Sequence, residues 1–193
     1  MKSVLFALLT IALIVFPAVF KGLERSAIAG GIAEPIALMQ AELAVLPGLK
    51  GAFAGERPSN IGVTNGILAP CPASPNCVVS QQADEKHAIA PIIYSSDRAT
   101  ARQALIDILG VVPGTKIVLQ SDDYILAESE SRLMGFVDDS EFYFPTDEKV
   151  IQTRAAARLG ESDLGVNRRR IEQIRLAFKD LEQRAATSPL TQK

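Results

Sequence analysis

Histidine, tryptophan and cysteine are scarce in this 193-residue chain, which has one histidine, no tryptophan and two cysteines. Structural zinc sites usually need four cysteine or histidine ligands, so this composition argues against one, and we expect neither a metal nor a cofactor. An excess of one charge is also missing, because 20 basic and 22 acidic residues give a net charge of −2. Such a balance provides no general attraction to nucleic acid, which is therefore not an expected partner.

What the chain does have is a long apolar run at its N-terminus. Lys2 precedes the apolar residues Val4–Phe20, which are followed by a polar patch and by the small-residue site Ala27–Ala29. This order is typical of a secretory signal peptide. The run of 17 residues also reaches the lower limit for spanning a bilayer. Residues 1–29 are predicted to be a cleaved signal or a retained membrane anchor, with the rest of the chain outside the cytoplasm.

The two cysteines agree with export. Cys71 and Cys77 lie in the segment PCPASPNC, whose proline, serine and asparagine residues exclude a helix interior. In an oxidising compartment we expect them to form a disulfide that contributes about 2 kcal/mol and holds the loop in shape. A reactive thiol pair and a pair of soft metal ligands are the alternatives, although the spacing is not C-x-x-C.

Residues 30–66 are predicted to hold a short apolar helix and a linker. Ile36–Leu46 is apolar on nearly all sides and is stopped by Pro47 and Gly48. This helix could pack on the domain or lie on a membrane or a partner. Residues 55–66 are turn formers and indicate a linker, so the folded domain is expected at residues 67–185, followed by a disordered tail at residues 186–193.

The remaining chain alternates between strand and helix patterns. A strand at Ile89–Tyr94 precedes a helix with Ser96 as its N-cap and Gly110 at its end. A second helix begins near Asn167 and repeats apolar residues at 171, 174, 178 and 181. Between them lie four strand candidates joined by short turns: Lys116–Gln120, Tyr124–Arg132, Phe136–Phe144 and Lys149–Leu159. The prediction is an α+β fold, an antiparallel meander sheet of four to five strands with two helices packed on one face.

Charged side chains alternate along these strands. In the last strand Gln152, Arg154, Ala156 and Arg158 share one face, and the two preceding strands carry acidic rows with the same period. We expect the arginine face to be uncovered, as a solvated surface with ion pairs. The alternative is a face that binds an anionic or polar partner.

The start of the last helix is the second candidate site. Asp163 and Asn167 are suited to capping, but Arg168, Arg169 and Arg170 lie where the helix dipole is positive, which is unfavourable unless an anion or carboxylate neutralises them. One hypothesis is that this segment has only a structural role, in which these residues cap and hold the start of the helix. The other is that Arg154, Arg158 and Arg168 or Arg169 converge to bind phosphate, a lipid headgroup or a partner's carboxylates.

Catalytic arrangements are weaker. Asp138 and Asp139 point to opposite faces if they lie in a strand, so they cannot act as an acid and base on one substrate. If the segment bulges, they could join Glu141 and Asp163 around a hard cation. Ser80, Asp84 and His87 supply the residue types of a hydrolase triad but no nucleophile-elbow motif. We assign no catalytic residue.

Three motifs together resemble the domain-of-unknown-function family 1499 (DUF1499): PCPASPNCVVS, GFVDDSEFYF and VIQTRAAARLGESDLGVNRRRIEQIR. The resemblance covers about residues 67–180. Family members usually read RSASR where this chain has Arg154, three alanines and Arg158, which weakens any role for serine nucleophiles there.

The resemblance implies a protein without established enzymatic activity. The cyanobacterial and chloroplast members of the family resemble proteins of the thylakoid lumen or periplasm that are tied to photosynthetic membrane complexes. We therefore expect a non-catalytic, exported and membrane-associated factor, anchored through residues 4–20 or resting on the membrane surface, that supports the assembly or stability of a membrane complex such as a photosystem. The alternative is a binding module for an anionic small molecule or lipid headgroup.

Overall fold

The computed structural model describes residue 51 and residues 53–187. The expected signal or anchor at residues 1–29, the expected helix at Ile36–Leu46 and residues 188–193 of the expected tail lie outside this part of the chain. Within residues 53–187, no helix is both long enough and apolar enough to cross a membrane.

The centre of the domain is an antiparallel meander. Its strands are neighbours in chain order, as predicted: β5 (Thr115–Gln120), β6 (Tyr124–Glu130), β7 (Val137–Tyr143) and β8 (Val150–Ala157). Two short strands, β3 (Cys77–Val79) and β4 (Ile92–Ile93), both pair antiparallel with β8 and complete a six-stranded sheet. The expected strand at Ile89–Tyr94 is therefore shorter than predicted. Pro91 lacks the N–H group that would continue the ladder, and the Ile89 N–H donates to Val79 instead.

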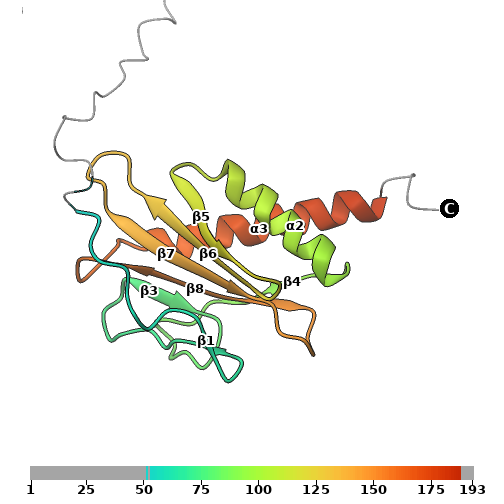
Figure 1. The fold of residues 1–193 in the computed structure, drawn as a ribbon, viewed down its shortest axis with the longest axis horizontal. Helices are drawn as coiled ribbons and strands as arrows, with labels where there is room; N and C mark the ends of the chain where they lie inside the picture. The colour runs from blue at the N-terminus through green and yellow to red at the C-terminus, as the bar shows by residue number, and fades with distance from the viewer. Residues whose placement is uncertain (1–50, 52, 188–193) are drawn as a thin grey trace, which may run out of the picture. The chain divides into compact units, whose positions relative to one another are not determined.

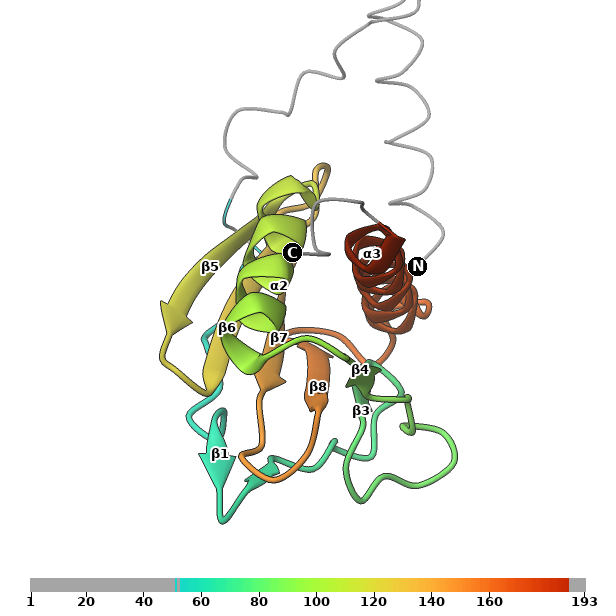
Figure 2. The ribbon, with the colours of Figure 1, turned by 90° about the vertical axis from the view of Figure 1, so that its right-hand side faces the viewer.

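Two helices cover one face of this sheet (Figure 2), which confirms the predicted α+β class. α2 (Arg98–Val111) buries four apolar residues at helical spacing: Ala101, Leu105, Ile108 and Leu109. α3 (Val166–Thr187) buries three apolar residues: Ile171, Ile174 and Phe178. The N-cap of α2 is Asp97, not Ser96. The Asp97 carboxylate accepts from the Thr100 N–H at 3.0 Å, whereas the Ser96 hydroxyl donates to Glu182 of α3 at 2.5 Å.

The second face of the sheet is also covered, which the sequence pattern did not predict. A hairpin of β1 (Val63–Thr64) and β2 (Ile67–Leu68) lies on the side opposite the helices (Figures 1 and 2). Leu68, Val79, Tyr124 and Leu126 form a second apolar cluster there, with Ile61 and Val63 packed against it. The segment expected to be a linker at residues 55–66 thus belongs to the fold, and the domain begins before Ile67.

The predicted disulfide is present. Cys71 and Cys77 are bonded, with their Cα atoms 5.6 Å apart. Cys77 begins β3 and is buried, and Cys71 packs against the second apolar cluster. The bond therefore attaches the covering segment to the edge of the sheet.

One buried hydroxyl in the helix-side core allows a stability prediction. The Ser140 hydroxyl is buried without a hydrogen-bond partner, so Ser140→Ala is expected to raise the free energy of unfolding by about 1 kcal/mol. Ser129, on the neighbouring strand, is the matched control, because its hydroxyl bonds to that of Thr115 at 2.7 Å. Ser129→Ala should lower the same free energy by about 1 kcal/mol. Urea denaturation of both variants measures the difference, and a Ser140→Ala protein less stable than wild type would contradict this prediction.

Candidate functional site

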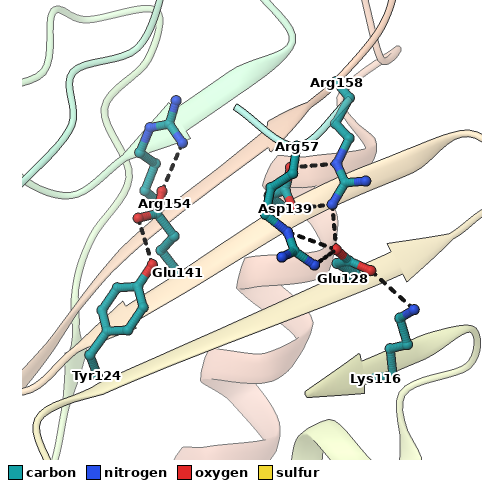
Figure 3. Close-up of polar contacts among 8 residues, drawn as sticks. All are labelled: Arg57, Lys116, Tyr124, Glu128, Asp139, Glu141, Arg154 and Arg158. Atoms are coloured by element: carbon teal, nitrogen blue, oxygen red, sulfur yellow. Dashed lines mark hydrogen bonds and ion pairs between the residues drawn. The ribbon is translucent and has the colours of Figure 1, made fainter. Parts of the chain in front are cut away.

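The predicted arginine face lies under the hairpin and the segment before it, and its charged side chains form two sets of contacts (Figure 3). Strand register brings these groups together, because Glu128 lies opposite Asp139 and Glu141 lies opposite Arg154. The face is not the solvated surface that we expected. The Glu141 side chain is 0% exposed and that of Arg154 is 4% exposed.

The inner set is centred on Glu141. One carboxylate oxygen accepts from Arg154 Nη1 at 2.8 Å. The other accepts from the Tyr124 hydroxyl at 2.9 Å and from the Gly62 N–H at 2.6 Å. Burial and the Glu141 charge raise the pKa of Tyr124, so its phenol keeps the proton that it donates. This is a buried ion pair in which both carboxylate oxygens have donors.

The outer set is centred on Arg158. Its guanidinium binds Asp139 through two hydrogen bonds of 2.8 and 2.7 Å and reaches Glu128 Oε1 at 2.5 Å. The same Glu128 oxygen also accepts from Arg57, and Glu128 Oε2 lies 3.2 Å from Lys116 Nζ. Bidentate binding to Asp139 raises the pKa of Arg158. Three cations face two carboxylates here, and the two outermost, Arg57 and Lys116, are 48% and 71% exposed.

The pairing of Glu128 predicts how stability changes with acid. Although burial favours the neutral acid, donation from Arg57, Arg158 and Lys116 lowers the pKa of Glu128 from 4.5 to about 2. A carboxyl whose pKa is depressed on folding stabilises the protein above its unfolded value and loses that contribution as the pH falls through the folded value. The free energy of unfolding should therefore decline between pH 4.5 and about 2, and Glu128→Gln should make this decline shallower.

Urea denaturation at a series of pH values tests this expectation, with Asp180→Asn as the control for an exposed pair. Asp180 binds Arg184 on α3, and its side chain is 58% exposed. Screened surface pairs contribute little, so this variant should keep the acid decline of the wild type. A Glu128→Gln protein with an unchanged decline would contradict the assignment.

Asp138 points to the helix side of the sheet, opposite to Asp139, as the alternation predicts. It accepts from Arg170 Nη2 at 2.9 Å, and burial raises its pKa against the opposing effect of Arg170. Arg170 also donates to the Asn167 side chain, which in turn donates to the Asn76 carbonyl at 3.2 Å. Asp138 and Asp139 therefore serve separate networks on separate faces.

The start of α3 is held by local contacts. The Asp163 carboxylate accepts from the N–H groups of Gly165 and Asn167 at 3.0 and 2.7 Å, so Asp163 does the capping that we expected it to share with Asn167. Arg168 donates to the carbonyls of Lys86 and Ala88, and Arg169 donates to that of Leu164. The hypothesis that these arginines converge with Arg154 and Arg158 does not match the geometry, because each guanidinium already has its own acceptor.

The remaining catalytic and metal arrangements are not assembled. His87 Nδ1 lies 2.8 Å from Asp84, but His87 Nε2 faces the Ser74 carbonyl at 3.2 Å. The Ser80 hydroxyl binds Gln152 and the Thr153 N–H, so the three residues do not form a triad. In the part of the chain that the structure describes, no three His, Cys, Asp or Glu side chains gather as metal ligands.

Sequence reasoning missed the contribution of Arg57 and understated those of Tyr124, Glu128 and Glu141. Arg57 lies 71 positions before Glu128 and was assigned to a linker. A usable signal was present on the strands, because acidic and basic residues occur on the same face of three consecutive strands. Opposite charges at facing positions favour direct pairing over separate solvation.

Comparison with known proteins identifies the fold unit. The model of the DUF1499 family, described as a protein of unknown function, matches residues 67–178. The chain belongs to this family. Neither a curated protein nor a solved structure matches it significantly. The matched segment of the DUF1499 domain contains the whole meander and most of α3, but it begins after Arg57 and Gly62, which complete the two charged sets.

Proposed function

We propose that this protein is a non-catalytic, exported and membrane-associated factor that supports the assembly or stability of a membrane protein complex, with photosynthetic complexes as the leading candidates. The observation that carries the proposal is the internal pairing of the candidate site. Arg154, Arg158, Asp138, Asp139 and Glu141 all bind partners within the domain. A catalytic acid, base or nucleophile has to reach a substrate, and each of these groups is already committed to a partner inside the domain.

The disulfide and the N-terminal pattern support the exported part of the proposal. Disulfides persist in oxidising compartments such as the periplasm, and Cys71–Cys77 is formed in this domain. The apolar run at residues 4–20 provides a signal or an anchor. Together they favour a thylakoid lumen or periplasmic location beside a membrane.

Affinity purification from native membranes tests the proposal. The full chain, tagged at its C-terminus and extracted in mild detergent, is expected to recover subunits of a membrane complex in fixed proportion. Membranes from cells that express the untagged chain are the control. Recovery of the chain alone, or its presence in the cytosol with both cysteines reduced, would contradict the proposal.

A second function, binding of a small anion, has one observation in its favour. The outer set has three cations and two carboxylates, and its excess positive charge is exposed at Arg57 and Lys116. Titration calorimetry with inorganic phosphate tests it. Arg57→Ala and Lys116→Ala should each weaken binding, whereas Lys179→Ala on α3 should not. Absence of phosphate binding to the wild-type chain would exclude this second function for phosphate.

A further inference from the structure

Apolar side chains gather at one end of the domain, outside both cores. Five of them are exposed to solvent by 36–83% of their surface, and Phe53 is half-buried beside them. We call this group the apolar rim: Phe53, Leu133, Met134, Phe136, Leu159 and Leu164. Single exposed apolar residues are ordinary, but several that come from neighbouring segments at one end of a domain suggest an interaction site.

The sheet register explains why these residues meet. The turn from β6 to β7 carries Leu133, Met134 and Phe136, and the pair Asp138–Ala157 places the end of β8 beside the start of β7. The segment between β8 and α3, which contains Leu159 and Leu164, leaves the sheet at this same end, where the described chain also begins (Figure 1).

The first described residues are attached to this end by direct contacts. The Phe53 ring lies 5.2 Å from the Phe136 ring. Gly55 passes so close to the end of β8 that a Cβ atom on it would come within 2.9 Å of Leu159 Cγ. The N-terminal segment thus enters the domain through the apolar rim.

The turn that carries the tip of the rim is held in shape. Ser131 donates its N–H to the Phe136 carbonyl at 2.8 Å, and its hydroxyl accepts from the Phe136 N–H at 3.0 Å. The Gly135 N–H donates to the Ser131 carbonyl at 3.1 Å. These bonds close the turn and hold Leu133 and Met134 at its tip, so the exposure of these side chains is built into the fold.

We infer that the apolar rim rests in the interfacial region of a lipid bilayer and orients the domain on the membrane. This inference rests on the proposed membrane association and adds the surface that makes contact. The length of the chain before Phe53 favours a lipid bilayer as the surface that the rim contacts. Six residues separate Leu46 from Phe53, a connection of at most about 25 Å. If the segment Ile36–Leu46 lies on a membrane, which is one of its two expected placements, this short connection tethers the rim to the same bilayer.

The charges around the rim favour lipid contact through apolar side chains. Arg132 is exposed in the same turn and, among the described residues, forms no ion pair. Its aliphatic stem can lie along the acyl chains while the guanidinium stays at the headgroups. Glu161 and Asp163 in the loop after β8 offset this positive charge. Neutral phosphatidylcholine should therefore be sufficient for contact, without anionic lipid.

The absence of tryptophan from the chain makes a direct test available. Leu133→Trp and Ile93→Trp each introduce a single fluorescent reporter at an exposed position, 62% and 74% exposed in the wild type. Ile93 pairs with Val150 at the start of β8, and the rim lies beyond the end of that strand. The two reporters are therefore at opposite ends of the sheet. The full chain carrying either substitution is reconstituted into phosphatidylcholine vesicles, with and without brominated acyl chains.

The tryptophan of Leu133→Trp is expected to shift its emission to shorter wavelength in vesicles and to be quenched by the brominated lipid, whereas that of Ile93→Trp should do neither. Equal behaviour of the two reporters on vesicle-bound protein would overturn the inference. So would a shift at Leu133→Trp that is present in native membranes but absent from these protein-free vesicles, because the rim would then bind a protein partner. The vesicles contain no other protein, so this result is independent of whether the purification recovers a complex.

Discussion

Glu141→Gln is expected to lower the free energy of unfolding by about 3–5 kcal/mol, because it leaves the buried Arg154 guanidinium without a counter-charge. Arg154→Met should have an effect of similar size by leaving the Glu141 carboxylate unpaired. The double variant should be more stable than the sum of the two losses predicts. A glutamine at position 141 can still accept from Tyr124 and Gly62, and a methionine at position 154 fills much of the arginine's volume.

Urea denaturation of the four proteins gives the coupling energy of the pair. Arg184→Met is the matched control, because Arg184 is 76% exposed and pairs with Asp180 on the surface of α3. It should change the free energy of unfolding by less than about 1 kcal/mol. If Glu141→Gln proved equally mild, the inner set would not be the buried pair described here.

Arg158→Met is expected to be the second severe variant, with a loss of about 3–5 kcal/mol. Asp139 is 1% exposed and takes both of its ion-pair hydrogen bonds from Arg158, so the substitution leaves a buried carboxylate unpaired. Arg57→Met is the comparison within the same network. Arg57 binds Glu128 from the solvent side and is 48% exposed, and Glu128 keeps its other cations in this variant.

The expected loss for Arg57→Met is about 1 kcal/mol or less. Thermal or urea unfolding under oxidising conditions, so that Cys71–Cys77 stays formed, measures both variants. Equal losses would mean that burial does not determine how much each arginine contributes to the free energy of unfolding. A small loss for both would support the alternative that this set is a loosely held anion site.

The buried pairing also bears on how the candidate residues of this family should be treated in experiments. Loss of function in Arg154 or Arg158 variants could arise from unfolding alone, since both are expected to be severe. The exposed residues Arg57, Lys116 and Leu133 are better probes, because their substitution leaves the buried pairs intact. The proposed membrane contact and the phosphate test both use such positions.

Local elements were predictable where a single chain segment carries the signal. The four buried positions of α2 recur at helical spacing, and the alternation in β7 correctly separated Asp138 from Asp139. Errors occurred where neighbours in space decide the outcome. Pro91 and the hydrogen bond from Ile89 to Val79 make β4 shorter than the predicted strand. β3 was not predicted, because it follows directly after the turn formers of PCPASPN.

The charged face also has one feature that a single strand determines and another that distant residues determine. Alternation correctly grouped Arg154 with Arg158, but exposure of that face depended on what covers it. The covering segment binds through Arg57 to Glu128 and through Gly62 to Glu141, across separations of 71 and 79 positions. No local pattern in residues 55–66 distinguishes such a segment from a linker, because turn formers are common to both.

By itself the sequence determined the strand meander, the apolar stripes of α2 and α3, the pairing of Cys71 with Cys77 and the side of the sheet on which each charged residue lies. These follow from backbone periodicity and from short distances along the chain. Only the tertiary structure decided that the arginine face is buried and that apolar residues from three separate segments meet at one end. Both outcomes depend on contacts between distant residues, in which burial removes water from charges that would otherwise be solvated and so makes their pairing necessary.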